Sequence, residues 1–470
     1  MDDNARRLEV PLPCPRHRFI AGSDHLSALR TRGGGAAAIH EPGLRKKSVH
    51  HVALGGRTAL VRVDFNVPLV PHPGAAATPP GVGPGPEGDA ARAGTARGPA
   101  HAQRVADDTR IRAAVPTIRH LLAGGARVVL CSHLGRPKGR PDPRYSLSQV
   151  AGDVERLVGA PVLFCPETVG PVARETARSA PAGSVVLLEN TRFHDGEERN
   201  DPDLARELAA LGDLFVNDAF GAAHRAHAST VGVARYLPAV GGLLLHREVE
   251  ALSRLLRPEP PLVAVIGGAK IADKLGVLRQ LLGRTQRLLL GGGMANTFLA
   301  ARGLEMGASL LERDLLPTAA DLLAEAARRG VEVVLPVDLV VGEGFAADTP
   351  HSAVATGAVP PGGMALDIGP RTVDVFARAL RGARTVFWNG PLGVSEWPAF
   401  AAGTAGVAAA VAGCQGFTVV GGGDSIAALR RLGRLEAIGH VSTGGGASLE
   451  FLEGRPLPGV ACLEDHGCSA

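Results

Sequence analysis

Short apolar runs alternate with longer amphipathic stretches along most of the chain. Runs such as SVVLLEN (184–190) and PLVAVIGG (261–268) are apolar on both faces, and a helix is expected over 108–123. Such an alternation is typical of parallel sheets with right-handed crossovers. The strands expected from these runs are too many for one sheet, so the pattern predicts an α/β protein with two doubly wound parallel-sheet domains. The expected strands lie within 58–67, 127–133, 161–164, 184–190, 213–220, 261–268, 287–293, 331–338, 385–390, 417–423 and 438–446.

Three segments interrupt this pattern. Residues 1–44 are rich in Arg, Gly and Ala without clear periodicity, and we interpret them as an N-terminal extension. Residues 71–106 are rich in Pro, Gly and Ala and almost devoid of large apolar side chains, which predicts a flexible surface insertion. Residues 236–261 are expected to form a helix ended by prolines, and this helix is the candidate connector between the two domains.

The residues that follow the expected strands differ between the two halves of the chain. Because ligands bind at the carboxyl ends of strands in open α/β sheets, these residues are candidate ligand contacts. The first half places cations and histidines there or at a helix start, whereas the second half places glycine-rich turns. Arginine matches carboxylate and phosphate oxygens, and glycine turns let backbone N–H groups approach a phosphate. The first half is thus expected to bind a small anion and the second a nucleotide. The cations and histidines are Arg110, His133, Arg136, Arg192, His224, Arg225 and His227.

The stretch VRVDFNVPL (61–69) adds a row of polar side chains to the first strand. Period-two alternation puts Arg62, Asp64 and Asn66 on one face of this strand. Buried polar groups need partners. An internal salt bridge satisfies Arg62 in one interpretation, and in the sharper one Asp64 and Asn66 bind substrate hydroxyls.

Two lysines stand out in GGAKIADKL (267–275). The chain has 50 lysines and arginines, and only Lys46, Lys47, Lys138, Lys270 and Lys274 are lysines. We expect Lys270 and Lys274 to share one face in the first turns of a helix. Two cations at the electropositive end of a helix are tolerated if an anion lies between them.

Composition narrows the class of protein. The net charge of +4 is modest for 470 residues, and no nucleic-acid motif accompanies the arginines, so no nucleic-acid partner is expected. The six cysteines form no paired framework, and no run is long and apolar enough for a membrane span; the expected location is the cytoplasm. The Walker A motif and the glycine loop of protein kinases are absent from the sequence, and no G-x-G-x-x-G is followed at the right distance by an acidic residue that could bind a ribose.

Taken together, the motifs resemble those of the phosphoglycerate kinase family. They occur in the family's order and cover about residues 45–464 except the insertion. The matching stretches are LVRVDFNVPL, DDTRI, SHLGRP, LLENTRFHDGEERND, FVNDAFGAAHRAHASTVG, GGAKIADKLGVL, GGGMANTFL, LPVDLVV, LDIGP, NGPLGVSEW, GGGDS and HVSTGGGASLEFLEG.

The resemblance implies two Rossmann-like domains that face a cleft, with the C-terminal segment returning to the N-terminal domain. It implies a phosphoglycerate-binding domain over 45–236, a connecting helix over 237–257, a nucleotide-binding domain over 258–440 and a returning segment over 441–470. The implied reaction is the reversible transfer of a phosphoryl group between 1,3-bisphosphoglycerate and MgADP, which gives 3-phosphoglycerate and MgATP. The implied protein is a monomer that needs Mg²⁺.

The resemblance also implies the role of individual residues. Arg110 and Lys270 would stabilise the phosphoryl group during transfer, and Asp424 would lie at the metal. Gly422–Gly423 and Gly445–Gly446 would stand at helix N-termini beside that group. The substrate ligands would be Asp64, Phe65, Asn66, Arg110, His133, Leu134, Gly135, Arg136, Arg192 and Arg225. The nucleotide ligands would be Lys274, Ala365, Asn389, Glu396, Gly422, Gly423, Asp424 and Ser425, with Glu396 at the ribose hydroxyls.

Some positions depart from the family pattern. Ala365 stands where a glycine is usual, Ser395 where an aromatic residue precedes the glutamate, and Ala222 where threonine is common. These changes affect the expected shape of the nucleotide pocket and leave the charged residues intact. Two other interpretations stay open at this point: a catalytically inactive relative that binds metabolites or acts as a scaffold, and an arginine-driven nucleic-acid binder.

Overall fold

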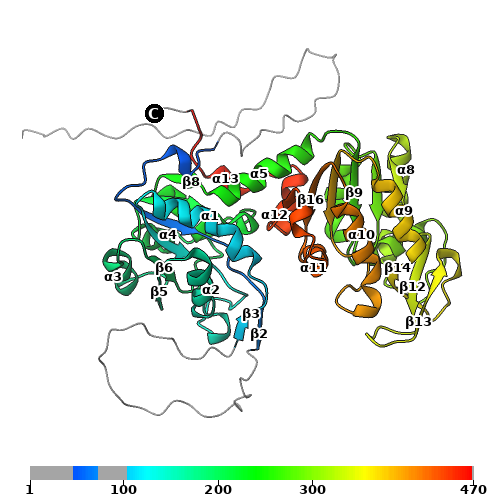
Figure 1. Ribbon diagram of the computed structural model, residues 1–470, viewed down its shortest axis with the longest axis horizontal. Coiled ribbons are helices and arrows are strands. Elements are labelled where there is room, and N and C mark those ends of the chain that lie inside the picture. The colour runs from blue at the N-terminus through cyan, green and yellow to red at the C-terminus, as the bar shows by residue number, and fades with distance from the viewer. Residues whose placement is uncertain (1–45, 72–102, 468–470) are drawn as a thin grey trace, which may run out of the picture. The chain divides into compact units, whose positions relative to one another are not determined.

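The first half of the chain is built around a six-stranded parallel sheet. The computed structural model describes residues 46–71 and 103–467, so the extension 1–44 and most of the insertion lie outside the described residues. The strand order is β5-β6-β4-β1-β7-β8, and every pair is parallel (Figure 1). The strands are β1 (Thr58–Arg62), β4 (Arg127–Cys131), β5 (Val162–Cys165), β6 (Val185–Leu188), β7 (Leu214–Asn217) and β8 (Ala239–Gly241).

Helices cover both faces of this sheet, as predicted for a doubly wound domain. Leu60 packs in one hydrophobic cluster with α3 (Pro171–Ser179) and α4 (Pro202–Ala209). Its neighbour Val61 packs in another cluster with α1 (Thr109–Ala123) and α2 (Ser148–Val158). Successive strand residues therefore face opposite apolar layers, which explains why the strands are apolar throughout.

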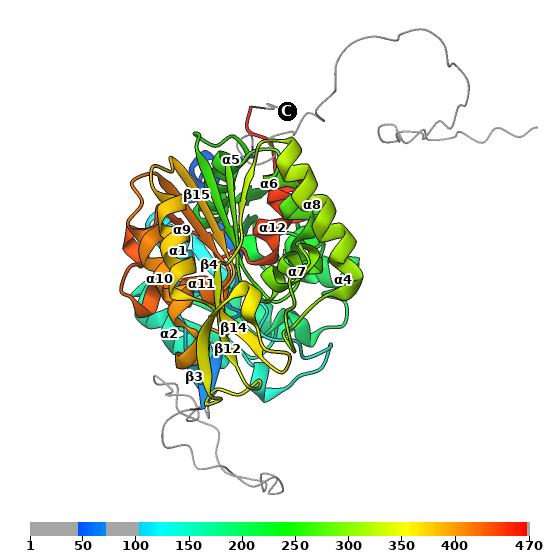
Figure 2. The same ribbon diagram turned by 90° about the vertical axis from the view of Figure 1, so that its right-hand side faces the viewer.

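A second six-stranded parallel sheet forms the centre of the other half, in the order β11-β10-β9-β15-β16-β17. Helices α7 and α8 lie on one side of it and α9 and α10 on the other (Figure 2). This sheet confirms the predicted fold class. Its strands are β9 (Leu262–Ile266), β10 (Arg287–Leu290), β11 (Glu332–Val334), β15 (Thr385–Asn389), β16 (Phe417–Gly421) and β17 (His440–Val441). Its helices are α6 (Leu275–Leu281), α7 (Gly293–Ala301), α8 (Leu316–Arg328), α9 (Pro370–Leu380), α10 (Ala402–Ala412) and α11 (Gly423–Arg431).

A small antiparallel sheet was not predicted. Strands β12 (Asp338–Gly342), β13 (His351–Ala355) and β14 (Met364–Ile368) pair in the order β13-β12-β14. The single strand expected over 331–338 is wrong, because β11 ends at Val334 and β12 begins at Asp338. Pro336 lies between them and has no N–H to donate to a ladder. The exposed surface of β13 also lacks the apolar run that marked the other strands.

The end of the predicted insertion also contributes a strand. Gln103–Val105 form β3, which pairs antiparallel with β2 (Leu69–Pro71). The prediction of a flexible surface insertion over 71–106 is therefore wrong at its two ends, where this two-stranded ribbon forms.

The helix expected over 236–261 is shorter than predicted. Helix α5 spans Leu243–Leu256, and the preceding Ala239–Gly241 form the edge strand β8. Asp218 Oδ1 accepts hydrogen bonds from the backbone N–H groups of Leu244 and Leu245. A carboxylate from the end of β7 thus fixes where the helix begins, and this signal is distant in the sequence.

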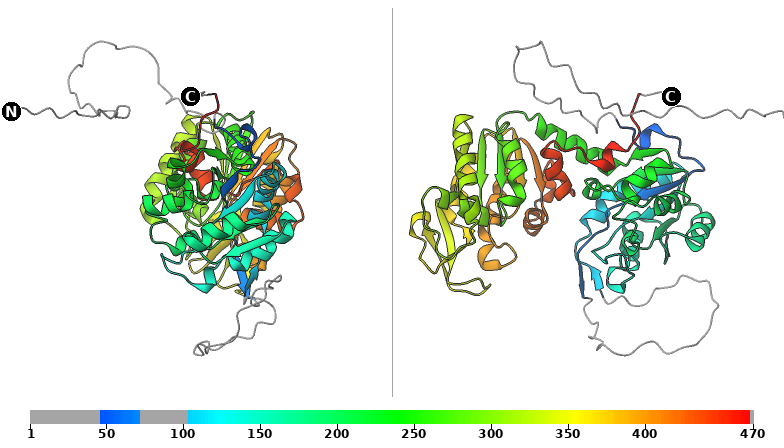
Figure 3. Two further views of the ribbon diagram at one scale, coloured as in Figure 1. Left: turned by 90° about the vertical axis from the view of Figure 1, so that its left-hand side faces the viewer. Right: turned by 180° about the vertical axis from the view of Figure 1, so that it is seen from behind.

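The C-terminal segment returns to the first half, as expected. It contains α12 (Gly446–Leu452) and α13 (Pro458–Ala461), which are drawn in red in Figure 3. Asn217 Nδ2 donates to the carbonyl of Gly459 at 2.8 Å, and Lys46 pairs with Asp465 at 2.8 Å. In the described part of the chain, every helix is too short or too polar to cross a membrane.

Candidate active site

A cationic cavity of about 210 Å³ lies at the carboxyl ends of the strands in the first half. The walls of this cavity are formed by β1, by the loops after β4, β6 and β7, by the start of α1 and by the C-terminal segment. It is lined by Arg62, Asp64, Asn66, Arg110, His133, Gly135, Arg136, Arg192, Gly221, Ala222, His224, Arg225, His227, Gly444, Gly445 and Gly446.

Most of the residues predicted to bind the substrate meet in this cavity. Asp64, Asn66, Arg110, His133, Gly135, Arg136, Arg192 and Arg225 all line it. Phe65 and Leu134 do not, because their side chains are buried in the hydrophobic core. The strand that carries Asp64 and Asn66 must anchor its opposite face in that core, and the N–H of Phe65 donates to Ser132 Oγ instead.

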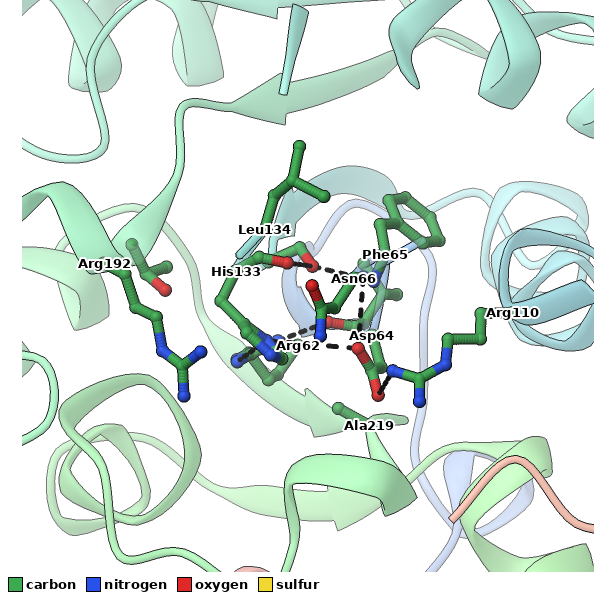
Figure 4. A network of polar contacts seen from close by, with 12 residues as sticks. Arg62, Asp64, Phe65, Asn66, Arg110, His133, Leu134, Arg192 and Ala219 are labelled. Atoms are coloured by element: carbon green, nitrogen blue, oxygen red, sulfur yellow. Dashed lines mark hydrogen bonds and ion pairs between the residues drawn. The ribbon is translucent and has the colours of Figure 1, made fainter. Parts of the chain in front are cut away.

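Arg110 and Asp64 form an ion pair at the edge of the cavity. Arg110 Nη1 donates to Asp64 Oδ2 at 2.7 Å, and Asn66 Oδ1 accepts from the N–H of Gly135 at 2.9 Å. Gly135 has φ +62°, and a Cβ there would stand 2.3 Å from a ring carbon of Tyr145. Arg110 and Arg192 lie on opposite sides of the cluster formed by Asp64, Asn66 and His133 (Figure 4). The pairing holds Arg110 aimed at the cavity before any ligand arrives.

Arg62 is buried behind these residues. Its Nε donates to Ser229 Oγ at 2.8 Å, and Ser229 Oγ donates to Glu197 Oε1 at 2.5 Å. Arg62 therefore does not form the expected internal salt bridge. Instead, the Ser229 hydroxyl links it to the carboxylate of Glu197. Arg62 Nη2 also donates to His133 Nδ1 at 3.0 Å.

The histidines of the cavity are neutral. Burial lowers the pKa of His227 to about 3, helped by Arg62, Arg192 and Arg225. Burial, together with Arg62 and Arg192, holds the pKa of His133 well below its ordinary value. Burial also lowers the pKa of Arg192, although Glu198 opposes this. The positive charge of the cavity therefore comes from guanidinium groups, which match oxyanions in fork geometry.

Several lining residues were not assigned a role from the sequence. Arg62, His224 and His227 were visible as polar strand ends, and Gly221 and Gly444 carried no polar signal. Gly444 reaches the cavity from the C-terminal segment, more than two hundred residues beyond Gly221 in the sequence. Only the fold places that segment against the first sheet. The start of α12 at Gly446 agrees with the helix N-terminus implied for Gly445–Gly446.

A second, glycine-rich cavity of about 350 Å³ lies in the other half. Its walls are glycine turns and apolar side chains, and three carboxylates also line it. The lining residues are Gly268, Ala269, Gly292, Gly293, Asn296, Leu310, Leu339, Phe345, Met364, Ala365, Leu366, Asp367, Ile368, Pro391, Leu392, Gly393, Val394, Glu396 and Asp424. At Gly292, φ is +69° and a Cβ would meet the Gly268 carbonyl at 2.7 Å, so no other residue allows this close approach of two turns.

The predicted nucleotide ligands divide into two groups. Ala365, Glu396 and Asp424 line the glycine-rich cavity. The second group does not line this cavity but lies beside the ends of β9, β15 and β16. Its members are Lys274, Asn389, Gly422, Gly423 and Ser425. Lys274 Nζ donates to Asn389 Oδ1 at 2.7 Å and to the Gly267 carbonyl at 2.6 Å. Ser425 Oγ accepts from the N–H of Gly390 at 2.9 Å.

The expected arrangement of the lysine pair is wrong. Lys270 precedes the first helical turn, which begins at Ala272, and its side chain is exposed. Lys274 instead folds back on strand-end carbonyls, where burial lowers its pKa to about 8. The two lysines therefore differ in environment: Lys274 is held by strand-end oxygens, whereas Lys270 is exposed.

Asp424 stands in the first turn of α11, which begins at Gly423. Partial burial raises its pKa, as does repulsion from Glu396, whereas Lys274 opposes both effects. Among the described residues no group of three or more His, Cys, Asp or Glu side chains is arranged to hold a metal. Two acidic side chains beside a cavity suit an ion such as Mg²⁺, which is usually held by one or two carboxylates together with substrate phosphates.

An aromatic group at the mouth of the glycine-rich cavity was missed. The Phe345 side chain is 65% exposed, and its ring stands 4.7 Å from that of Trp397. Trp397 in turn faces Phe400 at 6.1 Å. Aromatic residues make up only 4% of the chain, so an exposed one deserves a functional explanation; this scarcity was the available signal.

The fold and the two cavities define a class: an α/β protein of two parallel sheets, with an arginine-lined anion cavity in one half and a glycine-rich, apolar cavity in the other. The sequence comparisons identify the family. A sequence model of the phosphoglycerate kinase family matches residues 98–455. The chain belongs to the phosphoglycerate kinase family.

Individual relatives match about nine-tenths of this chain. A protein of Moorella thermoacetica named phosphoglycerate kinase is 53% identical, over 90% of this chain and 100% of that protein. One of Roseiflexus castenholzii with the same name is 50% identical, with the same coverage. The solved phosphoglycerate kinase of Coxiella burnetii superposes with a TM-score of 0.72 at 37% identity, over 89% of this chain and 98% of that one. That of Pyrococcus horikoshii gives 0.74 at 30% identity, with the same coverage.

Proposed function

We propose that the protein transfers a phosphoryl group reversibly between the acyl phosphate of 1,3-bisphosphoglycerate and MgADP. The single observation that carries this proposal is the presence, in one chain of this family, of an arginine-lined cavity and a glycine-rich cavity at the strand ends of two sheets. Two anions that must meet in line need such separate sites. The names of the relatives and the ATP-dependent glycolytic step that they imply support the same assignment.

The cationic cavity is the proposed site of 3-phosphoglycerate. Residues 45–236 form the proposed phosphoglycerate-binding domain. Asp64 and Asn66 bind the substrate hydroxyl, and Arg110, Arg136, Arg192, His133 and Arg225 bind its carboxylate and phosphate. Phe65, Leu134 and Gly135 contribute backbone, since the first two side chains are buried. The size of the cavity, about 210 Å³, suits a molecule of this kind.

The glycine-rich cavity is the proposed site of the nucleotide, within a domain over 258–440. Leu339 and Phe345 offer apolar surface for the base, and Glu396 accepts from the ribose hydroxyls. Ala365 lies beside Val341 across the β12–β14 pairing and lines the same apolar wall. The phosphates of the nucleotide are placed beside the Gly422–Ser425 turn, next to Lys274 and Asn389.

Lys270 and Arg110 are the proposed catalytic residues. Exposed Lys270 is unrestrained and can follow the phosphoryl group, whereas Arg110 is aimed from the first half by Asp64. The acyl phosphate is already a good donor, so no general base is needed. The side chains instead supply positive charge and exclude water.

Asp424, with Glu396 nearby, would hold Mg²⁺ on the nucleotide phosphates. When bound, the ion neutralises part of the phosphate charge. Asp424 is a ready oxygen ligand because the repulsion from Glu396 that raises its pKa is relieved by a cation.

The two halves already touch beside the proposed catalytic arginine. Arg430 of α11 pairs with Asp107 at 2.7 Å and donates to Thr109 at the start of α1. Helix α5, over the predicted 237–257 connector, joins the halves, and the segment 441–470 returns across them. We propose that closure of the halves brings the two bound anions together. The proposed working form is a monomer in the cytoplasm.

A coupled assay tests the function. ATP-dependent phosphorylation of 3-phosphoglycerate, measured with and without MgCl₂, should give turnover only with the ion. The absence of turnover in the full chain under both conditions would favour the inactive-relative interpretation.

A further inference from the structure

The side chain of Arg62 is 1% exposed, and its hydrogen bonds are all internal. Its Nη2 lies 3.0 Å from His133 Nδ1. A guanidinium group has donors only, so His133 Nδ1 must accept and cannot carry a proton. The ring is then the tautomer that is protonated on Nε2 alone.

Arg62 is itself unable to turn away. Its Nε donates to Ser229 Oγ at 2.8 Å, and its Nη1 donates to the Val63 carbonyl. Ser229 is fixed from behind by Glu197, which accepts from both its hydroxyl and its N–H. The guanidinium plane is thus held at two points, and the Nη2 donor that meets His133 is fixed with it.

The charges around His133 agree with a neutral ring. Burial keeps the pKa of His133 well below its ordinary value, and the guanidinium charges of Arg62, Arg192 and Arg110 act in the same direction. Asp64 is the opposing group, but its Oδ1 lies 4.0 Å from Nδ1, on the nitrogen that Arg62 already occupies.

The other ring nitrogen faces the ligand. His133 lines the cationic cavity, and Nε2 has no hydrogen-bond partner within 46–71 and 103–467. We propose that Arg62 is a positioning residue that selects the tautomer of His133, so that Nε2–H is a fixed, uncharged donor to an oxyanion in the cationic cavity. This inference rests on the proposed function for the identity of that anion, 3-phosphoglycerate.

The consequence is a site in which recognition by His133 is independent of proton uptake. A histidine that needed to be charged would bind the anion less well as the pH rises through neutrality. With the tautomer fixed by Arg62, His133 donates equally well throughout that range, and only the arginines carry charge.

The first test is spectroscopic and needs no turnover. Long-range ¹H–¹⁵N spectra of the histidine-labelled full chain are compared with those of His133→Gln to find the His133 signals. We expect an unprotonated Nδ1 and a protonated Nε2 from pH 6 to 8, and in Arg62→Met a ring that titrates or mixes tautomers. A protonated Nδ1 in the unsubstituted protein overturns the inference.

The second test compares two amides and does not depend on the folding of an Arg62 variant. The amide nitrogen of glutamine can replace Nε2–H, whereas that of asparagine falls near Nδ1. Calorimetric Kd values for 3-phosphoglycerate should stay within about threefold in His133→Gln and weaken by about tenfold or more in His133→Asn, as expected for a lost hydrogen bond to a charged group. Equal or reversed losses overturn the inference.

His120→Gln provides the matched control, since His120 contacts His50 and does not line the cavity. It should leave the Kd unchanged. If the Nε2 tautomer is observed but 3-phosphoglycerate does not bind and is not turned over, the proposed function fails and the role of Arg62 stands. If turnover is normal but the tautomer is absent, only the role of Arg62 fails.

Discussion

The two cavities of this protein differ in what forms their walls. In the cationic cavity, side chains hold one another: Asp64 aims Arg110, and Arg62 holds His133. In the glycine-rich cavity, backbone turns and apolar side chains form the walls, and the carboxylates of Glu396 and Asp424 are exposed. The cationic cavity is thus held together by contacts between its own side chains, whereas the glycine-rich cavity owes its shape to the backbone. Preorganised charge suits a small, highly charged anion, whereas a cavity of matching shape suits a larger ligand such as a nucleotide.

The largest expected effect tests the free lysine of the second half. In Lys270→Ala, kcat should fall by about 10²–10³-fold with little change in either KM, because the lost charge acts mainly on the group in transfer. Steady-state kinetics in the coupled assay measure this. Arg279→Ala, which removes an exposed cation from α6, should leave kcat unchanged. An unaltered kcat in Lys270→Ala would remove this residue from the mechanism.

The second prediction concerns the preorganised cation of the first half. Arg110→Ala breaks the 2.7 Å pair with Asp64 and leaves a buried carboxylate facing the anion site. We expect kcat/KM for 3-phosphoglycerate to fall by about 30-fold or more, in line with the loss of one partner of a desolvated charge pair. Arg112→Ala is the control, because its pair with Asp108 is exposed. If both variants lose activity equally, the effect belongs to α1 rather than to the pair.

A third prediction separates the cavities by substrate. Phe345→Ala should raise KM for ATP by about fivefold or more through lost contact with the base, with KM for 3-phosphoglycerate unchanged. Leu163→Ala, at another exposed apolar residue in β5, is the control and should change neither value. A rise in both KM values after Phe345→Ala would show that the two sites are not independent.

The smallest effect is on stability and comes from the capping carboxylate of α5. Burial raises the pKa of Asp218 to about 7, above its unfolded value of 3.8. The folded state therefore binds the proton more tightly, and this contribution to stability is full below about pH 3.8 and is lost as the pH rises to about 7.

Between pH 5 and 7.5 the unsubstituted protein should lose thermal stability more steeply than Asp218→Asn, by up to a few degrees in the midpoint. Scanning calorimetry over this range measures the slope. Asp321→Asn, an exposed carboxylate on α8, should show the slope of the unsubstituted protein. Parallel slopes in all three would mean that Asp218 is ionised in the fold.

Sequence patterns predicted the parallel sheets well and the small elements poorly. Strands such as β9 are apolar on both faces and are easily predicted from the sequence. In contrast, β13 is exposed and β8 is short, so neither gives a clear pattern. Strand-end cations predicted the cationic cavity almost completely, because parallel strands bring their ends to one edge. The lysine pair was misjudged because helical spacing was assumed where the helix had not yet begun.

The sequence alone determined the α/β class, the division into an arginine-rich and a glycine-rich half, and the family. These follow from local composition and order, which short-range sterics and burial convert directly into strands and turns. The tertiary structure decided which side chains are buried, which are held in place by other side chains and which are exposed. Burial, helped by the neighbouring Arg62, holds the pKa of His133 below its ordinary value, and Gly444 lines the first-half cavity because the chain returns. Such contacts depend on distances between residues far apart in the chain, which no local pattern encodes.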